Sequence, residues 1–78
     1  MKKLEQHLRQ VLSDNLRSLR NKNHISPEQL GELSGLHRTF VGSIERGERN
    51  VSLSTLAALS SALNISVSDL LTEKIRQK

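Results

Sequence analysis

Residues 26–50 read S-P-E-Q-L-G-E-L-S-G-L-H-R-T-F-V-G-S-I-E-R-G-E-R-N and carry the signals for two short helices that meet at a glycine. Ser26 is a favoured N-cap, Pro27 suits the first helical position, and Gln29 stands where its side chain closes a capping box. Gly35 ends this helix, because glycine adopts a positive φ at little cost. The pattern therefore predicts a helix that starts at Pro27 and stops just before Gly35.

A second helix follows after a short turn. It runs from Arg38 to Arg46, since Val41 and Ile44 stand three residues apart and share one face. Gly47 ends it by the same left-handed conformation. Two such helices, joined by a turn of about three residues that contains glycine, have the spacing of a helix-turn-helix. We expect one apolar seam between them, formed by Leu30, Leu33, Leu36, Val41 and Ile44.

These residues resemble the Xre family of bacterial and phage helix-turn-helix regulators, to which Cro and the phage repressors belong. The matching pieces are Gly35-Leu36, Val41, Ile44-Glu45-Arg46-Gly47, Ser52-Leu53-Ser54-Thr55-Leu56 and Ala62-Leu63. Within the family, the run L-H-R-T-F-V-x-x-I-E-R-G-x-R-N is most similar to the short controller proteins of restriction-modification systems. The resemblance covers about residues 12–71 and implies an all-α, five-helix, lambda-repressor-like DNA-binding domain.

The first part of the chain reads as an extended N-terminal helix. Apolar residues at positions 4, 8, 11, 12, 16 and 19 form a stripe of helical period. A break near Ser13 and Asp14 is an alternative, because either residue is a suitable N-cap for a separate helix. The family's first helix corresponds to about residues 13–22. We therefore divide the chain into an N-terminal helical extension (1–12), which is a candidate for packing on a partner subunit, a Cro/CI-type domain (13–72, motif at about 27–46) and a charged tail (73–78).

Two further helices follow the motif. Ser52 caps one that ends at Asn64, and Ser66, with Asp69 three residues later, caps the other. The apolar face of the fourth helix is Leu53, Leu56, Ala57, Leu59 or Ser60, and Leu63. The fifth helix carries Val67, Leu70, Leu71 and Ile75.

Composition narrows the class of protein. The 78 residues suit one domain, and the absence of cysteine rules out disulfides and thiolate metal sites, which favours a reducing cytoplasm. No apolar run is long enough to span a membrane. The formal net charge of +4 favours a polyanionic partner such as double-stranded DNA.

The sequence does not support an enzymatic function. The carboxylates are scattered over several predicted elements, and His7, His24 and His37 lie on three segments without ligand spacing. We therefore expect neither catalysis nor a cofactor or metal, and no segment is left for a small-molecule effector.

The DNA-binding reading gives particular residues a role. The N-terminal end of the second motif helix enters the major groove, so the base-contacting candidates are Arg38, Thr39, Ser43 and Phe40. Ser43 is expected on the same outward face as Thr39. Phe40 has two equal readings, as core filler or as an apolar contact to DNA. The phosphate-contacting candidates are Ser26, Gln29, His37, Arg46, Arg49 and Asn50. Pro27 departs from the family, where a glutamine is common, and Gln29 or Ser26 is the expected replacement.

The resemblance also implies an ion pair and a dimer. An arginine near the end of the family's first helix pairs with the glutamate before the turn after the recognition helix, which here are Arg20 and Glu45. Operators of such proteins are two-fold, so we expect a homodimer. Its interface is expected at Ile65, Val67, Leu70 and Leu71.

The function expected from these observations is sequence-specific regulation of transcription by a homodimer on a two-fold operator, with its own promoter as one target. The alternative is an antitoxin-type protein that binds a partner toxin and represses its own operon.

Overall fold

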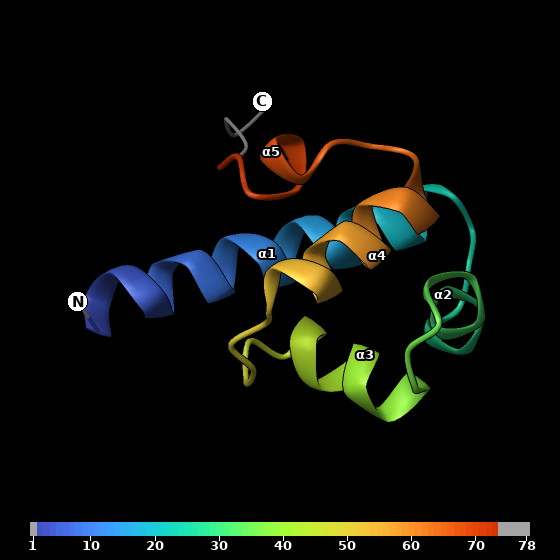
Figure 1. Cartoon of the computed structure of the whole chain (residues 1–78), viewed down its shortest axis with the longest axis horizontal. Coiled ribbons are helices and arrows are strands. Elements are labelled where there is room, and N and C mark those ends of the chain that lie inside the picture. Colours follow the sequence, from blue (N-terminus) through green and yellow to red (C-terminus); the bar gives the residue numbers. More distant parts are fainter. Residues whose placement is uncertain (1, 74–78) are drawn as a thin grey trace.

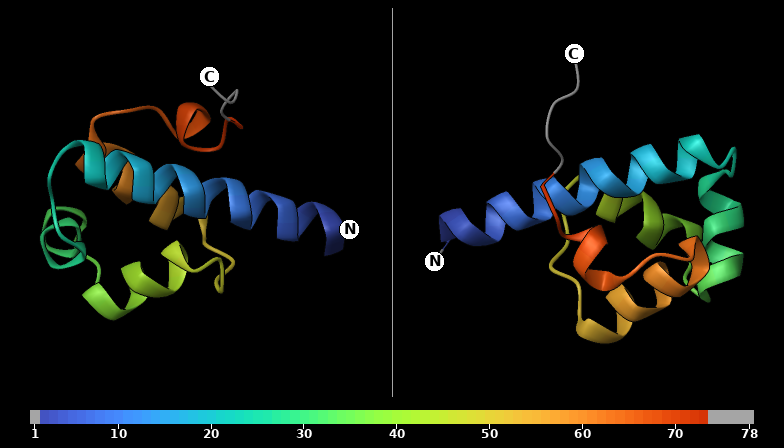
Figure 2. Two further views of the ribbon diagram at one scale, coloured as in Figure 1. Left: turned by 180° about the vertical axis from the view of Figure 1, so that it is seen from behind. Right: turned by 90° about the horizontal axis from the view of Figure 1, so that it is seen from above.

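The longest helix, α1, runs without a break from Lys2 to Lys22. It belongs to a computed structural model that describes residues 2–73, and its N-terminal end projects beyond the other helices (Figures 1 and 2). The other described helices are α2 (Pro27–Ser34), α3 (Arg38–Glu45), α4 (Leu53–Leu63) and α5 (Val67–Leu70). No strand occurs in residues 2–73, which confirms the expected all-α, five-helix fold. The predictions for Ile75 and for the tail beyond Glu73 lie outside the described residues.

The continuity of α1 decides between the two readings of the N-terminal segment. Ser13 does not cap a new helix; its buried hydroxyl donates a hydrogen bond to the backbone carbonyl of Glu45. Asp14 instead accepts hydrogen bonds from the side chains of Gln10 at 2.9 Å and Arg17 at 2.7 Å. A single helix that carries the extension is therefore correct, and the separate arm is not formed.

Local chemistry sets the bounds of α2 as expected. Ser26 Oγ accepts a hydrogen bond from the backbone N–H of Gln29 at 3.1 Å, and Gln29 Oε1 accepts one from the backbone N–H of Ser26 at 2.8 Å. Gly35 ends the helix with a φ of 78°. This reciprocal cap satisfies two of the N–H groups that a helix start leaves unpaired.

Close backbone contact joins α2 to the turn that follows. A Cβ added to Gly31 would lie 2.5 Å from the carbonyl oxygen of Leu36, so a side chain at this position has no room. The same approach allows the backbone N–H of Leu36 to donate to the Gly31 carbonyl at 2.9 Å. Gly31 therefore sets how tightly the chain turns from α2 into α3.

The C-terminal helices are also capped as predicted. Ser52 caps α4, which ends at Asn64 in the left-handed conformation, and Ser66 caps α5. The side chain of Asn15 in α1 donates to the carbonyls of Leu70 at 2.8 Å and Thr72 at 2.9 Å, which ties α5 to α1. Figure 1 shows α5 and α3 on opposite sides of the layer made by α1 and α4.

The core draws on every helix. Its buried members are Leu12, Leu16, Leu30, Val41, Ile44, Leu56, Leu59, Leu63 and Leu70. Three predicted members are absent, because Leu33 is 60% and Leu53 is 81% exposed and Ala57 is exposed as well. The buried face of α2 includes Leu30 and Gly31. At about 100° per residue, Leu33 lies about 60° from Leu30 on the side of the helix away from Gly31, so it falls outside the buried face. Among the described helices, none is both long and apolar enough to cross a membrane.

Candidate nucleic-acid interface

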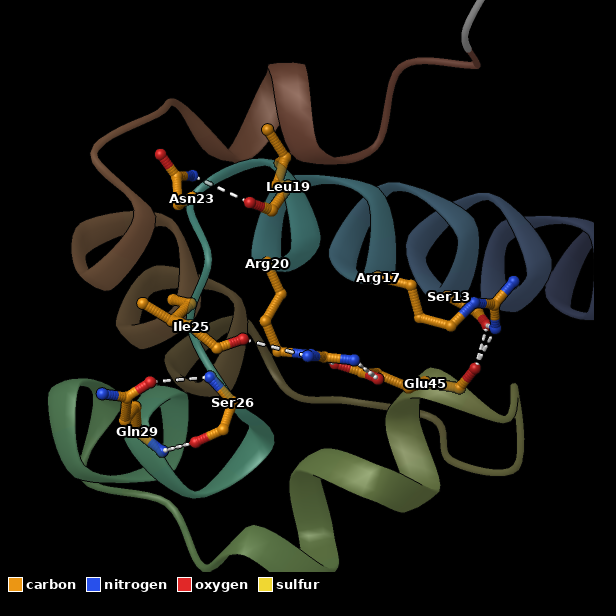
Figure 3. A network of polar contacts seen from close by, with 9 residues as sticks. All are labelled: Ser13, Arg17, Leu19, Arg20, Asn23, Ile25, Ser26, Gln29 and Glu45. Carbon is orange, nitrogen blue, oxygen red and sulfur yellow. Dashed lines mark hydrogen bonds and ion pairs between the residues drawn. The ribbon is translucent and has the colours of Figure 1, made fainter.

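The C-terminal end of α3 is fastened to α1 by the ion pair of Arg20 and Glu45 (Figure 3). Arg20 Nε lies 2.6 Å from Glu45 Oε2, and Arg20 Nη2 lies 3.0 Å from Glu45 Oε1. Only 14% of the Arg20 and 8% of the Glu45 side chain is exposed. The hydrogen bond to Glu45 raises the pKa of Arg20 above its ordinary value, so the guanidinium stays charged. A third arginine nitrogen, Nη1, donates to the Ile25 carbonyl at 3.0 Å.

Two more α1 side chains hold the same end of α3. The hydroxyl of Ser13 and the Nη1 group of Arg17 both donate to the backbone carbonyl of Glu45 (Figure 3). Neither residue was predicted to take part. The available signal was their spacing, since Ser13, Arg17 and Arg20 share one face of a helix. Together these contacts fix the orientation of α3.

The outer surface of α3 carries two of the residues that were predicted to contact bases. Arg38 and Thr39 are exposed in its first turn, and both line a shallow hollow. Pro27, Glu28, Gly42 and Arg46 complete its lining. The first turns of α2 and α3 and the end of α3 therefore share one open surface. Figure 1 shows α3 on the side of the molecule away from α5.

Ser43 corrects the expectation that it shares this outward face. It is 5% exposed, and its hydroxyl donates to the Phe40 carbonyl at 2.7 Å. Arg49 Nε donates to the Ser43 hydroxyl at 3.2 Å and so covers it. Four residues along a helix add about 40° to a full turn, which brings Ser43 closer to the core than Thr39.

Phe40 lies between the two positions predicted for it, a core residue and an apolar contact to DNA. Its ring is half-buried and packs against the core. The Arg49 guanidinium lies over the ring, with Cζ 5.3 Å from the ring centroid. This cation–π contact holds the side chain of Arg49, which belongs to the loop after α3, against Phe40 in the first turn of that helix.

Both arginines that line the hollow are paired with carboxylates. Arg38 Nη1 lies 2.5 Å from Glu28 Oε2, and Arg46 Nε lies 3.0 Å from Glu48 Oε2. All four side chains are more than half exposed. Glu28 was not predicted as a site residue, because a pair that spans ten residues and a turn has no periodic signal.

The remaining phosphate-contacting candidates already serve the protein's own structure. Ser26 and Gln29 form the capping box of α2, and His37 caps α3 by accepting the Thr39 N–H on Nδ1 at 3.0 Å. Asn50 Oδ1 accepts a hydrogen bond from Arg9 Nη1 at 2.6 Å. Arg9 is a further unpredicted contact, and it links the N-terminal extension to the loop after α3.

The predicted dimer residues divide into two groups. Leu70 is 0% exposed and packs within the core of its own chain, so its assignment to the interface is wrong. Ile65, Val67 and Leu71 are half-buried against that core. Leu4 and Leu8, on the projecting end of α1, are more exposed than any of them.

No group of three or more metal-ligating side chains occurs among the described residues. His7 instead lies 3.1 Å from Glu73, and His37 caps α3. The chemistry of the hollow is therefore that of guanidinium, hydroxyl and carboxylate groups on an exposed surface.

Comparison with known proteins identifies the relatives of this arrangement. Residues 16–70 match a helix-turn-helix family. The chain is 58% identical over 67 residues to the control protein C.SmaI of Serratia marcescens, covering 86% of this chain and 80% of that one. It is 39% identical over 66 residues to the control protein C.BamHI of Bacillus amyloliquefaciens, covering 83% and 82%. The crystal structure of the restriction-modification controller protein C.AhdI from Aeromonas hydrophila superposes with a TM-score of 0.77 at 44% identity, covering 80% of this chain and 94% of that one.

Proposed function

The chain belongs to the helix-turn-helix family of DNA-binding transcription regulators, and on that premise we propose that it binds a two-fold operator as a homodimer. The observation that carries this proposal is the hollow on the outer side of α3, where Arg38 and Thr39 stand exposed in the first turn. The N-terminal residues of a recognition helix are those that reach base edges in the major groove. Arg38 then forks onto a guanine, and Thr39 contacts the neighbouring base or its methyl group.

Positively charged groups around the hollow suit the sugar-phosphate backbone. Arg46 lines the hollow at the far end of α3, and Arg49 follows in the next loop. We propose that both contact phosphates, and that Asn50 does so as well. The buried Arg20–Glu45 pair supports this assignment, because it holds the end of α3 in one orientation to α1.

Dimerisation is part of the proposal because one copy of the motif covers few base pairs. Ile65, Val67 and Leu71 are the proposed interface residues, since each keeps part of its apolar surface outside the core. They belong to the end of the chain around α5 (Val67–Leu70). The two recognition helices, separated by about one turn of the DNA double helix, would then face the same side of the duplex.

The relatives also suggest what is regulated. C.SmaI and C.BamHI are named as control proteins, and C.AhdI is named as a restriction-modification controller. We propose that this chain likewise controls the genes of such a system, including the promoter of its own gene. The names of these relatives favour this reading over an antitoxin.

Selection of binding sites from random duplexes tests the proposal. The expected result is one enriched sequence with two inverted half-sites separated by about one turn of the helix, roughly 10 base pairs. Sedimentation of the complex should then give two chains per site. Recovery of duplexes without a shared sequence, or of a single unrepeated half-site, contradicts it.

A further inference from the structure

Glu28, in the first turn of α2, is the ion-pair partner of Arg38. Its Oε2 accepts a hydrogen bond from Arg38 Nη1 at 2.5 Å. The side chains are 63% exposed for Arg38 and 61% exposed for Glu28, and both line the hollow beside α3. A duplex that contacts Arg38 therefore also meets the carboxylate of Glu28.

The pair leaves most of the guanidinium available. Arginine carries five N–H donors in a planar fork, and Glu28 accepts from Nη1 alone. The edge formed by Nε and Nη2 is left for another acceptor. Such an edge makes two parallel hydrogen bonds to O6 and N7 of guanine. Arg38 can thus contact a guanine while Glu28 still holds it.

We propose that Glu28 is a positioning residue that sets the specificity of DNA binding by directing Arg38 to a base edge and away from phosphate. This inference rests on the proposed function, in which Arg38 contacts a base. Glu28 itself need not contact DNA, because it acts through the orientation of the arginine and through its own negative charge.

The charge of Glu28 separates the two competing targets of Arg38. A phosphate oxygen is an anion, and the carboxylate beside Arg38 repels it. A guanine edge is neutral and offers only acceptors, so it is repelled far less. Non-specific binding depends almost entirely on phosphate contacts. A carboxylate at this position therefore weakens binding to random sequence more than binding to the operator, which is how repulsive elements create specificity.

Glu28 also has a structural role that must be separated from this one. An acidic side chain in the first turn of a helix interacts favourably with the helix dipole. Loss of that interaction lowers stability but does not alter the preference for one base over another. The capping box is formed by Ser26 and Gln29, so it survives replacement of Glu28.

Glu28→Gln and the matched control Glu32→Gln test the inference. Both remove one negative charge from α2, and Glu32 is exposed without an ion pair in the described part of the chain. Dissociation constants are measured for the parent and both variants on the selected operator and on a scrambled duplex, at several salt concentrations. The same pair of substitutions is then made in an Arg38→Ala background.

Glu28→Gln should bind the scrambled duplex roughly two- to fivefold more tightly than Glu32→Gln does, which is the range expected for an exposed ion pair. The ratio of operator to scrambled affinity should fall by a similar factor. In the Arg38→Ala background the difference between the two variants should shrink, because only the direct repulsion of phosphate by Glu28 remains. Equal behaviour in the parent background overturns the inference, as does a difference that persists undiminished without Arg38.

Failure of the proposed function gives a different result. One such result is a parent protein that prefers no duplex; another is an Arg38→Ala variant that loses equal affinity for operator and scrambled DNA. In either case Arg38 does not contact a base specifically, and the role proposed for Glu28 is excluded as well. If the parent is specific and Arg38→Ala relaxes that specificity, only the comparison of Glu28→Gln with Glu32→Gln decides the inference.

Discussion

Arg20 and Glu45 form two hydrogen-bonded contacts, at 2.6 Å and 3.0 Å, in the most sheltered ion pair of the described residues. The pair joins α1 to the last residue of α3. The structure therefore predicts that the orientation of the recognition helix and the stability of the domain depend on the same contact.

Glu45→Ala should lower the free energy of unfolding by about 2–4 kcal/mol, because it leaves the Arg20 guanidinium sheltered without its counter-charge. Thermal denaturation measures this. Glu48→Ala is the control, since its pair with Arg46 is exposed and should matter by less than about 1 kcal/mol. Equal melting temperatures for the two variants would show that the Arg20–Glu45 pair contributes nothing.

Gly31→Ala should destabilise the domain by about 1–3 kcal/mol, because the added Cβ would lie 2.5 Å from the backbone carbonyl of Leu36. Gly42→Ala is the matched comparison in a helix. Its Cβ would meet only Arg46 Nη1, at 3.3 Å, and this flexible side chain can move. Gly42→Ala should therefore gain up to about 1 kcal/mol from helix propensity. Denaturant titration should give opposite signs; a gain for both would contradict the close packing of the turn.

Leu71→Glu should yield a folded monomer, since Leu71 is half-buried in its own chain and retains apolar surface for a partner. Leu4→Glu is the comparison, because Leu4 is an exposed apolar residue on the projecting end of α1. Sedimentation and circular dichroism of both variants locate the interface. A dimeric Leu71→Glu with a monomeric Leu4→Glu would move the interface to the N-terminal extension.

Arg38→Ala should cost roughly 1–3 kcal/mol on the operator and flatten the preference at one base pair per half-site. Arg49→Ala should instead weaken binding to every duplex about equally and reduce the salt dependence by about one phosphate contact per subunit. Arg38 opens α3, whereas Arg49 lies in the following loop over Phe40, which is the reason for the contrast. Titration of operator and scrambled duplex at several salt concentrations distinguishes them. Base-specific loss for Arg49→Ala would reverse the assignment.

Ser43→Ala should leave base preference unchanged, because the Ser43 side chain is buried beneath Arg49. Thr39→Ala, four residues earlier, removes an exposed side chain that lines the hollow and should relax the preference at one position. Repeated site selection with each variant measures both effects. An altered preference for Ser43→Ala would show that Arg49 moves aside when DNA binds.

Helix bounds could be predicted from the sequence because capping acts over three or four residues. Ser26, Ser52 and Ser66 each accept a hydrogen bond from the backbone N–H three residues later, as their spacing indicates. Gly35 and Asn64 end their helices in the left-handed conformation. The five-helix order and the family follow from these local signals together with the apolar pattern.

The spacing of residues along a helix predicted less reliably whether a given side chain is buried or exposed. Leu33 and Leu53 have core spacing but are exposed, and Ser43 has outward spacing but is buried. Leu70 was expected at a subunit interface and lies in the core instead. A three- or four-residue spacing shows which residues share a face, while the neighbouring helices decide whether that face is covered.

By itself, the sequence determined which residues cap the starts of α2, α4 and α5 and which residues end α2 and α4, and it placed Arg38 and Thr39 at the start of the recognition helix. Apart from the Arg20–Glu45 pair, which the family resemblance implied, only the tertiary structure decided which polar groups meet across elements. The contacts of Glu28 with Arg38, of Arg9 with Asn50 and of Ser13 with the Glu45 carbonyl join residues that are 10, 41 and 32 positions apart. Such contacts have no periodic signal, because the packing of α1 and the tight turn at Gly31 bring the partners together.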